Sequence, residues 1–154
     1  VMFGNGELPS CKPISEATWP RFMADCFSDE DKINRILPIG GPGAALSARQ
    51  QADLLFQALN RKPRLLSVPI ALMDGPIALL NGLSRLFPGL QDTAEFGRIG
   101  RYYASESMLV WDAAQERYDA EATPSYGTDT LEQFFQRVAR DGMKGQELGD
   151  AALF

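Results

Sequence analysis

The residues best suited to bind a ligand are concentrated in residues 95–107. On a helix, Glu95, Arg98 and Tyr102 would share a face. Arg101 would lie next to them, three positions after Arg98. A guanidinium binds a carboxylate through paired N–H groups, and a tyrosine ring can cover a flat conjugated surface. The segment therefore suits a flat aromatic anion. The same spacing also allows a structural ion pair between Glu95 and Arg98 beside half-buried tyrosines.

A second candidate is the glycine-rich loop Gly40–Gly43, which lies between an expected strand and an expected helix. A dinucleotide fingerprint requires G-x-G-x-x-G and an acidic residue about 20 positions further on. Leu46 stands where the third glycine belongs, and the next expected strand ends in Ser67-Val68 without an acid. We therefore predict a tight turn, with phosphate binding as the alternative.

The chain does not show the acid pair that short-chain reductases commonly use, a tyrosine with a lysine four residues later. None of Tyr102, Tyr103, Tyr118 and Tyr126 has that lysine. There is no histidine, which excludes a Ser-His-Asp triad and a His-ligated metal in this chain. The sequence alone therefore identifies no catalytic residue.

The composition narrows the range of partners. The 154 residues carry a net charge of −5, with a pI of about 4.7, which argues against nucleic acid because phosphate binding needs a clustered basic surface. Cys11 and Cys26 form no C-x-x-C pair, so we expect reduced, buried thiols and no metal or iron–sulfur site. The length suits a single segment, residues 1–154, without an internal boundary.

Secondary-structure signals place these residues in a mixed α/β chain. A capping box at Ser47–Gln50 predicts the start of a helix. Asn5-Gly6 is typical of a hairpin turn. The expected helices are 15–27, 47–59, 90–104 and 129–141, and the expected strands are 34–39, 64–68 and 107–111, with Tyr118 on a hairpin partner.

The most apolar stretch is residues 69–87. Asp74, Asn81 and Arg85 interrupt it, and Pro76 should kink it, so a membrane span is disfavoured. We expect a buried or pocket-lining helix, with a helix on a membrane surface as the alternative. Peripheral membrane association therefore stays open.

Five sequence blocks carry a resemblance to a known family. The chain resembles the 8-vinyl reductases of chlorophyll and bacteriochlorophyll synthesis, which are atypical short-chain reductases related to NmrA-like proteins. The run from Phe96 to Ala104 is the most specific block. One departure is Thr18, where the family pattern leads us to expect an aspartate. The blocks, in order along nearly the whole chain, are 13–16, 37–43, 68–74, 95–104 and 123–131.

The resemblance implies a fold and a reaction. It implies an α/β chain that is the C-terminal, substrate-side part of an NAD(P)-binding Rossmann-type fold, without the N-terminal cofactor half. It implies hydride transfer from NADPH to the 8-vinyl group of divinyl chlorophyllide a or protochlorophyllide a, giving an ethyl group. The catalytic and cofactor-binding residues are then expected upstream of this chain.

Under this hypothesis, residue chemistry suggests how the pigment binds. Arg98 or Arg101 would pair with its free propionate, and Tyr102, Tyr103, Phe96 and Met73 would line the macrocycle. Two alternatives are an NmrA-like regulator or photosystem assembly factor that binds a dinucleotide without turnover, and a related reductase acting on another hydrophobic substrate. The expected location is the cytoplasm of a photosynthetic bacterium, or the chloroplast in a plant or alga.

Overall fold

The computed structural model of the chain describes residues 2–143, and these form a mixed α/β structure with small sheets. The helices are α1 (Thr18–Ser28), α2 (Ala48–Ala58), α3 (Asp74–Ser84), α4 (Gln91–Ser105) and α5 (Leu131–Asp141). Short 3-10 turns lie at η1 (Glu30–Lys32), η2 (Ile70–Met73) and η3 (Pro88–Leu90).

Three two-stranded sheets connect these helices. β1 (Met2–Phe3) runs parallel to β4 (Ser67–Val68), and β2 (Ser10–Cys11) runs antiparallel to β3 (Leu46–Ser47). β5 (Val110–Asp112) and β6 (Arg117–Asp119) form a hairpin in which Trp111 is opposite Tyr118.

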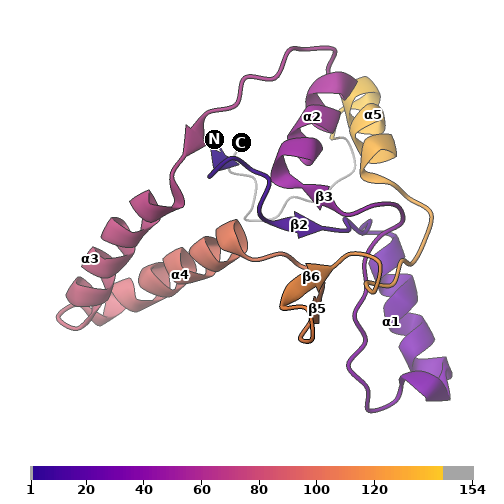
Figure 1. Ribbon diagram of the computed structural model, residues 1–154, viewed down its shortest axis with the longest axis horizontal. Helices are drawn as coiled ribbons and strands as arrows, with labels where there is room; N and C mark the ends of the chain where they lie inside the picture. The colour runs from indigo at the N-terminus through magenta and orange to yellow at the C-terminus, as the bar shows by residue number, and fades with distance from the viewer. Residues whose placement is uncertain (1, 144–154) are drawn as a thin grey trace.

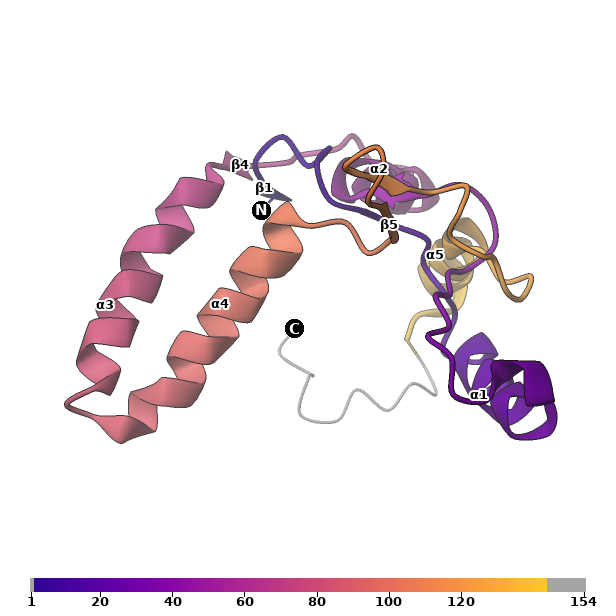
Figure 2. The same cartoon turned by 60° about the horizontal axis from the view of Figure 1, so that its bottom comes forward.

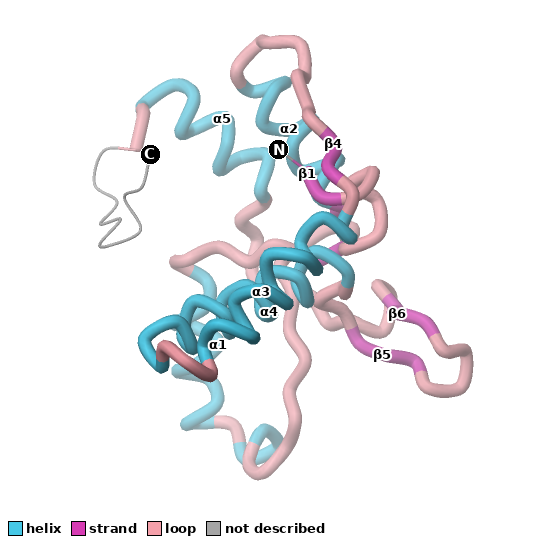
Figure 3. Tube along the Cα trace, turned by 90° about the vertical axis from the view of Figure 1, so that its left-hand side faces the viewer, coloured by secondary structure: helices cyan, strands magenta, loops and turns pink. Residues whose placement is uncertain are grey.

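The elements are spread out. Helices α3 and α4 form an antiparallel arm on one side, α2 packs against α5 on another, and α1 lies at the far end (Figures 1 and 2). Figure 3 shows the arm from its own side, with the short strands behind it. The buried apolar residues in the described part are few, and two of the four are alanines: Met2, Ile77, Ala94 and Ala104. This chain alone therefore buries little apolar surface.

The arm is held together by close helix packing. Ala94 is 1% exposed, and a Cβ placed on Gly97 would lie 3.1 Å from Cγ1 of Ile77 on α3. Small residues at this contact let the two helix backbones approach, whereas larger side chains would separate them. Gly97, inside α4, therefore has a packing role.

Capping boxes fix the starts of α2 and α5. Ser47 accepts a hydrogen bond from the Gln50 N–H, and the Gln50 side chain accepts one from the Ser47 N–H. Thr130 and Gln133 repeat the arrangement at α5. The capping box predicted at Ser47 is confirmed, and each box supplies partners to backbone N–H groups that a helix start leaves free.

The glycine-rich loop lies where three distant segments cross. The Gly40 N–H donates to the Pro124 carbonyl at 2.8 Å, and the Gly41 N–H donates to the Lys12 carbonyl at 3.0 Å. A Cβ on Gly41 would fall 1.6 Å from the Pro13 carbonyl oxygen, so only glycine fits there. The loop therefore connects the segment at Lys12–Pro13 with the segment at Pro124 through backbone hydrogen bonds.

Several expected elements differ from the observed ones. The strand predicted at residues 34–39 is wrong, because these residues form no strand and Ile36 is 97% exposed. The strand predicted at 64–68 is reduced to Ser67–Val68. The Asn5-Gly6 turn does not close a hairpin, because β1 and β2 belong to different sheets. Cys11 is a free thiol but half-buried rather than buried.

The apolar stretch 69–87 is helical but not buried. It forms η2 and α3, and of its large apolar side chains only Ile77 is buried, whereas Leu79 is 64% exposed. The expectation was a buried or pocket-lining helix, and burial is wrong for the described residues. In residues 2–143, no helix combines the length and the apolar character that crossing a membrane requires.

Candidate substrate site

Helix α4 positions most of the predicted binding residues on different faces. Gly97 and Arg101 lie on the face that packs against α3, through Ile77 and Asp74 respectively. Phe96, Gly100 and Tyr103 follow one another at spacings of four and three residues, so they share a second face.

Both predicted arginines are engaged with acids of this chain. Arg98 pairs with Glu95 at 2.5 Å, as the spacing predicts, and about half of each side chain is exposed. The Nε of Arg101 donates to Oδ1 of Asp74 on α3, with side chains 42% and 50% exposed. The acid raises the pKa of Arg101 further, so its charge is permanent. Exposed pairs of this kind contribute at most about 1 kcal/mol to stability, so a ligand carboxylate can compete for either arginine.

The predicted residues lie at different distances from the sheets along the arm. Met73 has its Cε 3.7 Å from the position of a Cβ on Gly100, and Arg101 contacts Asp74, which follows Met73 in the chain. Met73 and Arg101 therefore lie on the side of the arm where α3 meets α4, whereas Tyr103 lies on the second face of α4. Phe96, which is 77% exposed, lies about a turn nearer the tip, with Arg98 after it.

A hollow of about 340 Å³ opens beside the face of α4 that carries Gly100 and Tyr103, and the other predicted residues do not line it. Tyr103 and Gly100 line it from α4, and Phe3 and Leu65 line it from the region of β1 and β4. The Tyr102 ring meets the Tyr103 ring edge to face, with centroids 6.0 Å apart, but Tyr102 does not line the hollow. The missing side chain at Gly100 leaves room for a flat ligand to approach the helix backbone.

The β5–β6 hairpin adds an aromatic group that sequence reasoning missed. The Tyr118 hydroxyl donates to Oε2 of Glu106 at 2.5 Å, and the Trp111 and Tyr118 rings meet edge to face at 5.0 Å. Because the Glu106 carboxylate accepts a hydrogen bond from the neutral phenol, the pKa of Tyr118 rises to about 12. Tyr126 donates to Asp25 at 2.5 Å, which also raises its pKa. Neither phenol is therefore an activated acid near neutral pH.

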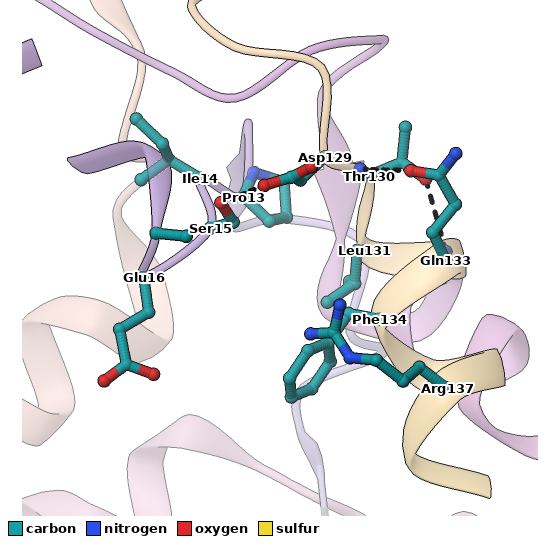
Figure 4. Close-up of a pocket in the computed structure, with 11 residues that line it drawn as sticks. Pro13, Ile14, Ser15, Glu16, Asp129, Thr130, Leu131, Gln133, Phe134 and Arg137 are labelled. Carbon is teal, nitrogen blue, oxygen red and sulfur yellow. Dashed lines mark hydrogen bonds between the residues drawn. The ribbon is translucent and has the colours of Figure 1, made fainter. Parts of the chain in front are cut away.

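A larger cavity of about 600 Å³ lies elsewhere, between residues 13–17 and the start of α5 (Figure 4). Phe134 and Arg137 line it from α5, with the Arg137 guanidinium 5.5 Å from the Phe134 ring centre. Sequence reasoning did not assign this cavity, although two of the family-like blocks, 13–16 and 123–131, supply part of its wall. The presence of both blocks in the sequence was the one feature that could have pointed to this cavity.

The departure at Thr18 has a structural role beside this cavity. Thr18 is 3% exposed, and its hydroxyl donates to Oδ2 of Asp129 at 3.3 Å. The Ser15 hydroxyl donates to the same oxygen at 2.8 Å, and its oxygen accepts the Thr18 N–H. Thr18 thus helps to tie the start of α1 to the segment before α5, whereas an aspartate there would bring a second carboxylate towards Asp129.

The glycine-rich loop and the helix after it do not fit the phosphates of a dinucleotide. In the glycine-rich loop, the N–H groups of Gly40 and Gly41 are bonded to the Pro124 and Lys12 carbonyls. The N-terminus of the following helix is capped by Ser47 and Gln50. A phosphate cradle needs free N–H groups at such a loop and helix start, so a tight structural turn describes this loop.

The chain is similar over its whole length to plant reductases. It is 60% identical over 154 residues to the chloroplastic divinyl chlorophyllide a 8-vinyl-reductase of Zea mays, and equally to that of Oryza sativa subsp. indica. The Arabidopsis thaliana protein of the same name is 55% identical over 150 residues. The chain spans 38%, 38% and 36% of these relatives' lengths. No family model and no solved structure matches. The resemblance predicted from the five blocks is thereby confirmed.

Proposed function

We propose that this chain is the C-terminal, substrate-side part of a divinyl chlorophyllide a 8-vinyl-reductase, in an atypical short-chain reductase fold of Rossmann type. The observation that supports this proposal is an identity of 54–60%, over 150–154 residues of the chain, to four proteins of that name. The substrate is a divinyl chlorophyllide or protochlorophyllide. By analogy with the names of these relatives, the chloroplast is its location.

The end of the α3–α4 arm nearest the sheets supplies one wall of the pigment site. Arg101 would bind the propionate, exchanging its Asp74 partner for the ligand, and Tyr103 would lie against the macrocycle where Gly100 leaves space. Phe96 and Tyr102 extend the aromatic surface along α4, and Met73 adds to it from η2. The hollow of about 340 Å³ is near the lower end of ligand pockets, roughly 300–1,000 Å³. A tetrapyrrole therefore needs a second wall, which the rest of the protein would provide.

The reduction adds a hydride and a proton across the vinyl double bond, and we infer that NADPH is the hydride donor. The N–H groups of Gly40 and Gly41 are already bonded within the chain, and we place the NADPH site in the rest of the protein. The role of this chain is then to bind and orient the flat substrate, which contributes to rate by positioning the reacting carbon.

The test uses the complete protein that contains this segment. It is incubated with NADPH and divinyl chlorophyllide a, and the pigments are separated by chromatography. An NADPH-dependent monovinyl product supports the proposal. Binding of NADPH without conversion would refute it and favour a non-catalytic regulator or assembly factor of the NmrA-like type, and conversion of only other hydrophobic substrates would refute the pigment assignment.

A further inference from the structure

The hollow beside α4 is apolar except for one side chain. Its walls come chiefly from β1, α2, the segment before β4 and the end of α4. Figure 2 shows β1 and β4 beside this end of α4. Among the lining residues of the described part, Met2, Phe3 and Leu65 are apolar, and those other than Tyr103 are alanine, proline or glycine. The Tyr103 hydroxyl is therefore the one side-chain group in this lining that can donate a proton.

The hydroxyl of Tyr103 is not engaged within the described part of the chain. Tyr118 and Tyr126 each donate to a carboxylate at 2.5 Å, whereas the Tyr103 hydroxyl forms no hydrogen bond within residues 2–143. The Tyr102 ring packs against the Tyr103 ring but does not line the hollow. Of the four tyrosines, Tyr103 thus combines a place in the wall of the hollow with a hydroxyl that is available to a ligand.

The proposed reduction needs a proton donor beside the pigment. A hydride added to the outer carbon of the vinyl group sends the π electrons into the conjugated macrocycle, and the inner carbon must then take up a proton. A phenol is protonated near neutral pH and can act as a general acid when it lies next to the reacting carbon. Within the described residues, no carboxylic acid, lysine or cysteine lines the hollow, so Tyr103 has no competitor there.

We propose that Tyr103 is the catalytic proton donor of this reduction, an inference that rests on the proposed function. The O–H bond of Tyr103 breaks as a C–H bond forms at the inner vinyl carbon, and the electron pair of that bond is the one that the hydride addition placed in the macrocycle. Solvent then reprotonates the phenolate, since the side chain is 53% exposed. Gly100, three residues earlier on the same face of α4, leaves space for the pigment beside the ring. The proton donor then belongs to this chain and not to the part upstream, where the resemblance places the catalytic residues.

The test is Tyr103→Phe in the complete protein, which keeps the ring and removes the hydroxyl. With NADPH and divinyl chlorophyllide a, kcat should fall at least about 100-fold, because a positioned general acid contributes about 10²–10⁴-fold to the rate. The dissociation constant of the pigment, measured without NADPH by quenching of protein fluorescence, should change by less than about twofold, because the ring that covers the macrocycle remains. The matched control Tyr126→Phe removes a hydroxyl that bonds to α1 outside the hollow, and it should keep the kcat of the wild type.

Three results would overturn the assignment of Tyr103. The first is a kcat of Tyr103→Phe close to that of the wild type. The second is weaker pigment binding with an unchanged kcat, which would make Tyr103 a binding residue only. The third is an equal loss of kcat in Tyr126→Phe, which would attribute the effect to the fold. If the wild type itself forms no monovinyl product, the proposed function fails and this inference fails with it, whereas conversion by both the wild type and Tyr103→Phe refutes the inference alone.

Discussion

Replacement of Arg101 by alanine should weaken pigment binding far more than it weakens the fold. The Arg101–Asp74 pair is about half exposed on both sides, so its loss costs at most about 1 kcal/mol of unfolding free energy. A hydrogen bond to a charged ligand group contributes about 1.5–3 kcal/mol. Because Arg101 is 42% exposed, we expect the lower end, which corresponds to a KM about tenfold higher. The value of kcat should change by less than about twofold, since an anchoring group acts equally on the ground and transition states.

Asp74→Asn is the matched control for this prediction. It removes the same ion pair but leaves the guanidinium free for the ligand. Its KM should stay the same or fall, whereas its melting temperature should match that of Arg101→Ala. Steady-state kinetics with divinyl chlorophyllide and thermal unfolding of the complete protein measure both quantities.

Arg98→Ala tests the alternative anchor, because Arg98 is paired with Glu95 in the same exposed manner. A tenfold rise in KM for this variant alone would transfer the role to Arg98. If KM is unchanged in both arginine variants, or if Arg101→Ala and Asp74→Asn change KM equally, the anchoring argument is refuted.

Two further predictions concern the packing of the α3–α4 arm and the pH response of Tyr118 on the β5–β6 hairpin. Gly97→Leu should destabilise the protein by about 1–3 kcal/mol in thermal unfolding, because the new side chain would collide with Ile77. Gly82→Ala is the control, because nothing lies within 4 Å of a Cβ there, and it should be neutral or stabilising by about 0.5–1 kcal/mol. Equal effects of the two substitutions would contradict the packing. Tyr118→Phe should lower the melting temperature at pH 7–9, and the difference from the wild type should shrink as pH rises from about 10 towards 12. The reason is that Glu106 raises the pKa of Tyr118 in the folded state to about 12, above an unfolded value near 10, so the stabilisation is lost through that interval. A difference in melting temperature that is independent of pH would refute the hydrogen bond.

The local signals in the sequence predicted the helices well. The capping residues Ser47 and Thr130 mark the starts of α2 and α5, and the expected helix 90–104 corresponds to Gln91–Ser105. Pro20 falls in the first turn of α1, where a proline removes no helical hydrogen bond. The hairpin pairing of Tyr118 was also predictable, because its strands are close in sequence.

Features that depend on distant contacts could not be predicted. The apolar residues of 34–39 suggested a strand, but a strand needs a partner, and in residues 2–143 the nearest pairing is a single bridge from Gly40 to Ser125. The leucines of 69–87 suggested burial, yet α3 packs only through the side that bears Ile77. Asp74 was visible in the sequence, but its pairing with Arg101 depends on the antiparallel packing of α3 on α4.

Hydrogen–deuterium exchange of the complete protein, with and without divinyl chlorophyllide a, tests the central claim most directly. The account predicts slower exchange in peptides covering residues 94–105 when the pigment is bound, because ligand contacts with Phe96, Arg101 and Tyr103 stabilise α4 against local opening. Peptides covering residues 13–17 and 131–137, around the larger cavity at α5, should be unchanged. Protection at α5 without protection of α4 would contradict the account and place the pigment in that cavity.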